Sequence, residues 1–132
     1  MHISSRILKF GLAGGIGFVV DSGLVTILVW AGVDPVLGRC FSISIALVTT
    51  WLVNRSLAFA DRAPGPPNLP EFLRYVSASL VASLVNFGLY WLMVRWQGIF
   101  AQWPVLAVAI ATGVSMCMNF FSYFKLVFAH RR

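Results

Sequence analysis

A single carboxylate lies near the middle of a long apolar segment of the sequence. Residues 10–30 read FGLAGGIGFVVDSGLVTILVW, and Asp21 is the one charged residue among them. An apolar segment of about 20 residues is long enough to cross the hydrocarbon core of a bilayer as a helix. A charge at that depth is costly and needs a polar partner, so Asp21 is a candidate functional residue.

The best candidate for the partner of Asp21 is Arg39. At about 1.5 Å per residue, Asp21 lies roughly 16 Å and Arg39 roughly 24 Å above the inner membrane boundary, a gap that an arginine side chain can largely span. Pairing lowers the cost of both charges. In the alternative interpretation, Arg39 extends to the outer membrane surface and has no such partner.

Other polar residues in the apolar segments add candidate binding residues without indicating an enzyme. Asn86 and Asn119 offer amide groups for hydrogen bonds with hydroxyl groups. No Ser/His/Asp or Cys/His set is placed for catalysis, and both histidines lie near the chain ends. Because the acids form no close pair within a span and no metal-ligand spacing occurs, we expect no enzymatic activity, no metal and no cofactor.

The composition is that of a membrane protein. Of the 132 residues, 59% are hydrophobic and 11% are charged, whereas about a quarter of a soluble domain is charged. The formal net charge of +6 comes from basic residues between the apolar segments, which favours contact with anionic lipids over nucleic acid. Cys40 and Cys117 fall toward opposite sides of the membrane, so we expect no disulfide between them.

Four apolar segments are long enough to be transmembrane helices, at about 10–31, 36–53, 73–94 and 104–124. GVDP connects the first two and QGIFAQWP the last two, while a linker at about 60–70 is rich in Pro, Gly and charge. Asn68 and Glu71 have the spacing of a capping box, which predicts that the third helix begins there, before the membrane.

The basic residues predict the orientation of the chain. Eight of the ten Lys and Arg residues lie on the side of the termini and the linker, and only Arg39 and Arg95 lie toward the other side. By the positive-inside rule, we expect both termini and the linker in the cytoplasm.

The sequence contains an internal repeat. An offset of 65 residues aligns Asp21-Ser-Gly-Leu with Asn86-Phe-Gly-Leu, and an offset of 69 aligns WLVNRSLAF at 51–59 with FFSYFKLVF at 120–128. We therefore predict an all-α membrane protein with a single transmembrane domain, 1–132. Its four transmembrane helices form two parallel-repeat helical hairpins, at about 5–59 and 71–128, related by a pseudo-two-fold axis along the membrane normal.

Small and polar residues four positions apart predict which face of each helix packs inward. These predicted stripes are Ala13, Gly17 and Asp21; Ser42, Ala46, Thr50 and Asn54; Ala78, Ala82 and Asn86; and Ala111, Ser115, Asn119 and Tyr123. The small members are interpreted as packing residues, and Asp21, Asn86 and Asn119 as functional candidates.

In the order and spacing of these elements, the chain resembles the GtrA-like family of small four-span membrane proteins. The resemblance rests on KFGLAGGIGFVVDSGL, GRCFSISIALVTTWLVNRSLAF, FLRYVSASLVASLVNFGLY and MNFFSYFKLVF, and it covers nearly the whole chain. The residues at matching positions are Lys9, Asp21, Arg39, Asn54, Arg55, Phe59, Arg74, Asn86, Asn119 and Phe128. Phe124 stands at the position aligned with Arg55, and Lys125 is the cation beside it.

The resemblance implies translocation of polyprenyl-phosphate-linked sugars across the bacterial cytoplasmic membrane, for the synthesis of cell-surface polysaccharides. A membrane-associated glycosyltransferase that makes the lipid-linked sugar is the expected partner. The residues expected to receive the phosphate are Lys9, Arg55, Arg74 and Lys125 on the cytoplasmic side and Arg39 on the outer side. Asp21, Asn86 and Asn119 are expected to bind sugar hydroxyls or to couple to a proton. Asn54 is included among the expected binding residues because its position matches the family pattern.

Two other functions are consistent with the sequence. A non-transporting scaffold would anchor the glycosyltransferase, and the linker and basic tail would then matter more than Asp21. A small multidrug-type cation exporter would also have four spans and an acid in the first of them. Because four helices enclose little volume, we further expect a homo-oligomer, most simply a dimer.

Overall fold

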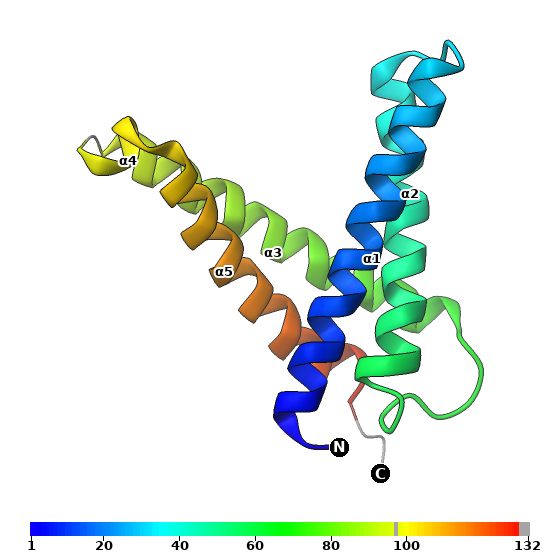
Figure 1. Ribbon diagram of the computed structural model, residues 1–132. Helices are drawn as coiled ribbons and strands as arrows, with labels where there is room; N and C mark the ends of the chain where they lie inside the picture. Colours follow the sequence, from blue (N-terminus) through cyan, green and yellow to red (C-terminus); the bar gives the residue numbers. More distant parts are fainter. Residues whose placement is uncertain (97, 130–132) are drawn as a thin grey trace. The chain divides into compact units, whose positions relative to one another are not determined.

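The computed structural model describes residues 1–96 and 98–129 of the chain (Figure 1). Its elements are α1 (Ile3–Trp30), α2 (Pro35–Val53), the π-helical η1 (Asn54–Ala58), α3 (Leu69–Arg95), α4 (Ile99–Gln102), α5 (Pro104–Ser122) and the π-helical η2 (Tyr123–Val127). Within the described ranges there is no strand, and the predicted all-α class is confirmed.

Four helical stretches of the described chain are long and apolar enough to cross a membrane, and they follow the predicted order. They are Ile3–Trp30, Pro35–Ala58, Leu69–Arg95 and Val105–Val127. The first begins earlier than the predicted boundary near residue 10, because hydropathy marks only the apolar part of a helix. Residues 3–9 carry Arg6 and Lys9 but contain no Gly or Pro to end the helix.

The turn between α1 and α2 is specified by its sequence. Gly32 has a φ of +89°, a conformation that other residues rarely adopt and that lets the chain reverse. The Asp34 side chain then accepts hydrogen bonds from the backbone N–H groups of Val36 at 3.1 Å and Leu37 at 3.2 Å. With Pro35 as the first helical residue, this is a standard helix start.

The predicted start of the third helix is confirmed. Asn68 Oδ1 accepts a hydrogen bond from the backbone N–H of Glu71 at 3.0 Å, and α3 begins at Leu69. The Glu71 carboxylate accepts hydrogen bonds from side chains of α2 and η1, as described below. Between α3 and α5, the predicted connection QGIFAQWP contains the short helix α4. Gln97, the first residue of this connection, lies outside the described residues.

The described chain forms two compact units. The first contains Met1–Phe72 together with Phe128 and Ala129, and the second contains Leu73–Val127. In the first unit, α1 and α2 pack against each other as an antiparallel hairpin, and η1 also packs on α1 (Figure 1). In the second unit, hydrogen bonds and a ring contact join α3 to α5 and η2.

Burial agrees with the predicted inward stripes. Their buried members are Ala13, Gly17, Ser42, Ala46, Asn54, Ala82, Ala111, Ser115 and Tyr123. The helices of the first unit approach closely at Gly17, where an added Cβ would overlap the Cγ2 methyl of Thr50. Small residues therefore set the distance between these two helices.

Both α2 and α5 pass into a π-helical segment, and the two segments are 69 residues apart. Phe59 follows the first and Phe128 the second, and their rings stack with centroids 4.7 Å apart at an angle of 15°. Such π-helical turns are rare and frequently mark functional sites. The helix boundaries thus agree with the offset found in the sequence, while the pseudo-two-fold relation of the two hairpins stays a prediction.

Candidate functional site

Asp21 is the centre of a polar cluster inside the first hairpin. Arg39 Nη1 donates a hydrogen bond to Asp21 Oδ2 at 2.6 Å, and Ser42 Oγ donates to Asp21 Oδ1 at 2.8 Å. One carboxylate of α1 therefore binds two side chains that lie one turn apart on α2. The predicted contact between Asp21 and Arg39 is confirmed, and Ser42, interpreted from sequence as a packing residue, is a second partner.

The three side chains of this cluster differ in exposure. Ser42 is fully buried, the Asp21 side chain is 19% exposed and the Arg39 side chain is 52% exposed. A guanidinium has five N–H donors, and within the described chain only one donor of Arg39 has a partner. The carboxylate is thus fixed in the seam of the hairpin, while Arg39 can bind an anion or a hydroxyl group from outside it.

A groove of about 270 Å³ lies beside the cluster, between α1 and α2. Its walls are mostly apolar and include Phe18, Ile43 and Leu47, and Gly14 and Gly17 leave it open because they have no side chains. Asp21 lines the groove at the end nearest the α1–α2 turn. The groove can therefore place a hydroxyl-bearing group against the carboxylate, which accepts hydrogen bonds.

The second unit contains a neutral polar contact at a related position. Asn86, at the position of Asp21 in the repeat, donates from Nδ2 to Ser115 Oγ at 3.0 Å. Under the offset of 69 residues, Ser115 corresponds to Ala46 rather than to Ser42. The helices of the second hairpin are thus joined by an uncharged polar contact. Its serine lies one turn closer to the π-helical segment than Ser42 does in the first hairpin.

The seam of the second unit continues with polar groups toward η2. Asn119 Oδ1 is enclosed and has no hydrogen-bond partner among the residues that the structure describes. One turn further on, the Tyr123 and Ser79 hydroxyl groups form a hydrogen bond, and the Tyr123 ring stacks on Tyr75 with centroids 4.2 Å apart. In the first unit, Asn54 is buried at the start of η1.

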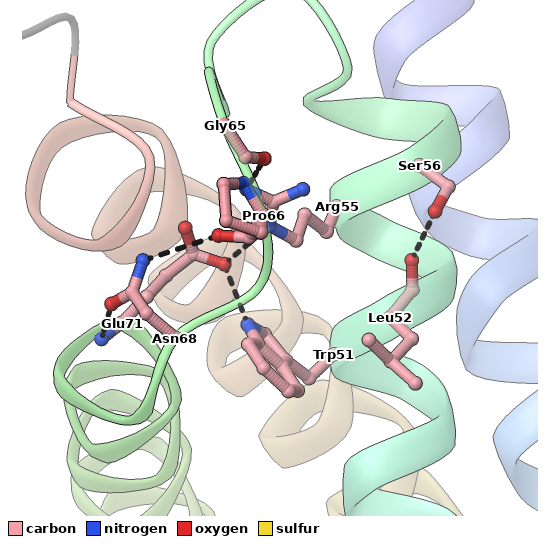
Figure 2. A network of polar contacts seen from close by, with 8 residues as sticks. All are labelled: Trp51, Leu52, Arg55, Ser56, Gly65, Pro66, Asn68 and Glu71. Carbon is pink, nitrogen blue, oxygen red and sulfur yellow. Dashed lines mark hydrogen bonds and ion pairs between the residues drawn. The ribbon is translucent and has the colours of Figure 1, made fainter.

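A second polar network joins the end of α2 to the start of α3, as Figure 2 shows. Glu71 Oε1 accepts hydrogen bonds from Trp51 Nε1 and from Arg55 Nε, each at 2.9 Å, and Arg55 Nη2 donates to the Gly65 carbonyl at 2.7 Å. Glu71 is 5% exposed and the Arg55 side chain is 11% exposed. Arg55, which we expected to receive a phosphate, is therefore largely buried and already has a carboxylate as counter-ion.

The pairing role of Glu71 was not predicted from the sequence, in which Glu71 was identified only as a capping residue. The signal that could have found it is the scarcity of acids, since the chain has only four. A cation at the end of an apolar helix needs a counter-ion, and Glu71 is one of the two acids that follow Arg55 in the chain.

Arg6 is a buried cation that the sequence analysis counted only in predicting the orientation. Its Nη1 and Nη2 donate to the two carboxylate oxygens of Asp61 at 3.0 and 2.9 Å, and Nη1 also donates to the Ala58 carbonyl at 2.8 Å. The guanidinium lies 5.5 Å from the centre of the Phe59 ring. Mainly through these hydrogen bonds, Arg6 lowers the pKa of Asp61 below its ordinary value of 3.8.

The linker at 60–70 is held at several points along its length. Besides Asp61, Arg62 Nε donates to the Phe128 carbonyl at 2.9 Å, and the Gly65 carbonyl accepts from Arg55. The linker is therefore tied to α1, to η1 and to Phe128, although its composition is typical of flexible segments.

The partners of the four carboxylates show which cations of the chain are already paired and which are available to an anionic ligand. All four acids of the chain precede residue 73: three pair with arginines and Asp34 caps α2. Three of the expected phosphate-binding cations have no ion pair, hydrogen bond or ring contact with other described residues, namely Lys9, Arg74 and Lys125. Lys9 is half-buried and the other two are exposed.

The described residues contain no group of three or more His, Cys, Asp or Glu side chains that could hold a metal ion. Cys40 and Cys117 are both exposed and free.

The family model for the GtrA/DPMS transmembrane domain matches residues 9–131. The matched region contains the Asp21 cluster, the Asn86–Ser115 contact and the Trp51–Arg55–Glu71 network. A comparison with curated proteins found no match to the chain.

Proposed function

The chain belongs to the family of GtrA/DPMS transmembrane domains, and from this premise we propose that it flips polyprenyl-phosphate-linked sugars across a membrane. Family membership and four apolar helices make it a multi-pass membrane protein of glycosylation-related lipid–sugar processes. We assign it to the bacterial cytoplasmic membrane, with both termini in the cytoplasm, because the basic residues gather on that side. We propose that the flipped lipid-linked sugars serve the synthesis of cell-surface polysaccharides.

The Asp21–Arg39–Ser42 cluster is the observation that carries this proposal. Charges within a span are costly and typically mark a pathway for a polar substrate. The headgroup of a lipid-linked sugar carries hydroxyl groups and a phosphate. The carboxylate of Asp21 can accept from the hydroxyl groups, and the exposed donors of Arg39 can bind phosphate oxygens by charge-assisted hydrogen bonds.

The second unit contains neutral polar groups of the kind that bind sugar hydroxyls. Asn86 and Ser115 offer amide and hydroxyl groups, and the amide oxygen of Asn119 accepts no hydrogen bond from the described part of the chain. We propose that the hydrocarbon tail stays in the lipid while the headgroup follows the polar seam of a hairpin. Because four helices enclose little volume, we also propose that the working form is a homodimer.

The test is a flipping assay in vesicles that contain the purified protein and a short-chain prenyl-phosphate sugar with a fluorescent label. The rate is read from the access of a membrane-impermeant quencher. We expect wild type to accelerate flipping over empty vesicles, and Asp21→Asn and Arg39→Gln to lower the rate at least tenfold. Ser44→Ala is the matched control, because Ser44 lies on α2, is exposed and bonds only to the Cys40 carbonyl. Wild-type vesicles that flip no faster than empty ones would refute the proposal.

We propose that the protein itself catalyses no reaction and that a separate membrane-associated glycosyltransferase makes the lipid-linked sugar. The fixed linker also favours a second candidate function, a non-transporting scaffold for that enzyme. Residues 64–70 are exposed, although the linker is tied down at Asp61, Arg62 and Gly65. As a scaffold, the protein would lose co-purification of the enzyme when residues 63–67 are replaced by Gly and Ser, and Asp21→Asn would have no effect.

A further inference from the structure

The second unit has a groove between the beginning of α3 and the end of the helix formed by α5 and η2. Its volume is about 570 Å³. Leu73, Arg74, Ser77 and Val81 of α3 line one side, and Ser122 and Leu126 line the other. From Arg74 to Val81 the helix rises about 10 Å, so Arg74 lies toward one end of a groove that is otherwise mostly apolar.

Arg74 is the cation of this groove, and no acid neutralises it. Arg74 is exposed, and the whole of residues 73–127 contains no Asp or Glu. The other arginine of α3, Arg95, lies at the far end of the helix, with its guanidinium 5.0 Å from the centre of the Trp91 ring. By contrast, Arg55 of the first unit already has Glu71 as its counter-ion. Arg74 is the charged residue in the lining of the groove, so an anion that binds in the groove pairs with Arg74.

We propose that this α3–η2 groove binds a membrane lipid with a phosphate headgroup and a prenyl chain. Arg74 holds the phosphate, for which the fork of N–H donors is well suited. The chain lies along Leu73, Val81 and Leu126, and the small side chain of Ala78 leaves room for its methyl branches. This inference rests on the proposed function, since it names the site at which the flipped lipid is received.

The lining of the groove favours a lipid over a soluble phosphate ester. Most of its walls are apolar, and α3 is long and apolar enough to span the membrane. A soluble phosphate would gain contact only with Arg74, whereas a prenyl phosphate also covers the apolar walls. The Ser77 hydroxyl already donates a hydrogen bond to the Leu73 carbonyl at 2.8 Å, so its proton is not available to the phosphate.

The test uses the full chain in detergent micelles and geranylgeranyl phosphate with a photoreactive group in its tail. We expect cross-links in 73–81 and 122–126 after illumination, mapped by mass spectrometry. Arg74→Gln should weaken binding at least tenfold, and Arg74→Lys should weaken it less because the charge remains. Arg95→Gln is the matched control, from the other end of the same helix, and should bind as wild type does.

Two further measurements separate the lipid from other sources of phosphate. Geranylgeraniol, which lacks the phosphate, should bind more weakly than the phosphate and equally to wild type and Arg74→Gln. Inorganic phosphate at the same concentration should not compete. Ala78→Phe, which fills the groove, should reduce cross-linking at 122–126.

The outcomes distinguish this inference from the proposed function. Cross-links elsewhere in the chain, or equal binding by Arg74→Gln and wild type, overturn the α3–η2 groove even when wild type flips the lipid in vesicles. Binding in the groove that depends on Arg74, by a protein that does not flip the lipid, sustains the groove and refutes the flipping function.

Discussion

Trp51 Nε1 lies 2.9 Å from Glu71 Oε1, and this hydrogen bond joins the end of α2 to the start of α3 across the linker. The same oxygen accepts from Arg55, and the Trp51 ring contacts Phe72 with centroids 5.0 Å apart. A buried carboxylate is stable only when it is paired and hydrogen-bonded. Glu71 meets this condition through residues that precede it by 16 and 20 positions.

Replacing Glu71 with Ala should destabilise the protein strongly. The change leaves the largely buried Arg55 without its carboxylate and the Trp51 N–H without an acceptor, and breaking a buried ion pair in this way costs about 3–5 kcal/mol. Glu71→Gln should cost less, because the amide oxygen can still accept from Trp51. Unfolding in detergent, followed by tryptophan fluorescence, measures both effects. The exposed Ser83→Ala is the control, and a Glu71→Ala protein as stable as this control would show that the network is dispensable.

Replacing Gly17 with Ala should separate α1 from α2. A Cβ at this position overlaps the Thr50 Cγ2 methyl, and overpacking of this kind costs about 1–3 kcal/mol. Gly15→Ala is the matched control, because nothing lies within 4 Å of its Cβ position. The control should be neutral or stabilised by up to about 1 kcal/mol through helix propensity.

Thr50→Ser removes the overlapping methyl and should restore much of the stability that Gly17→Ala loses. Thermal unfolding of the two single variants and the double variant provides the comparison. If the double variant is no more stable than Gly17→Ala, the close approach at Thr50 is not the cause of the loss.

The Arg6–Asp61 pair should make stability depend on pH below about 4. Because the pKa of Asp61 in the folded protein lies below its ordinary value of 3.8, the pair stabilises the fold above that value. The contribution is lost as the pH falls through the lower, folded-state pKa. Asp61 is 41% exposed, so solvent screening keeps the effect under about 1 kcal/mol.

Asp61→Asn tests this dependence. We expect the variant to be less stable than wild type at pH 6, and the difference to shrink as the pH falls below the ordinary Asp61 pKa of 3.8. Unfolding midpoints from pH 6 to pH 3 give the difference directly. A difference that stays constant over this range would show that the charge of Asp61 does not stabilise the fold.

The contacts that follow from regular helix geometry could be predicted from the sequence. The rise per residue placed Arg39 near Asp21, and the four-residue spacing identified the inward stripes, whose buried members include Ala13 and Gly17 on α1 and Ser42 on α2. The Glu71–Arg55 pair depends instead on the path of a linker rich in Pro and Gly, which no periodicity describes. The π-helical turns were not predicted either, because no residue type specifies them.

The register of the polar contacts also could not be predicted. The repeat aligns Asp21 with Asn86, but it does not show that their partners, Ser42 and Ser115, lie one turn apart in the repeat. That difference depends on how each pair of helices packs. The spacing of a stripe shows which face of a helix turns inward, but not which position of the stripe contacts the partner helix.

Asp21 and Arg39 should differ in their effect on stability because they differ in burial. Arg39→Gln leaves the 19% exposed carboxylate of Asp21 without its cation, whereas Asp21→Asn leaves only the 52% exposed Arg39 side chain unpaired. An unpaired charge costs more where it is more buried, so Arg39→Gln should be the more destabilised variant. The double variant has no unpaired charge in this cluster and should regain part of the stability, as thermal unfolding in detergent would show.

Flipping rates of the same three variants separate a structural pair from a functional one. If the pair binds the lipid-linked sugar, the double variant should flip about as slowly as the slower single variant, because all three lack part of one binding unit. If the pair only holds α1 against α2, flipping should recover together with stability in the double variant. Recovery of stability without recovery of flipping is therefore the result that assigns the Asp21–Arg39 pair to transport.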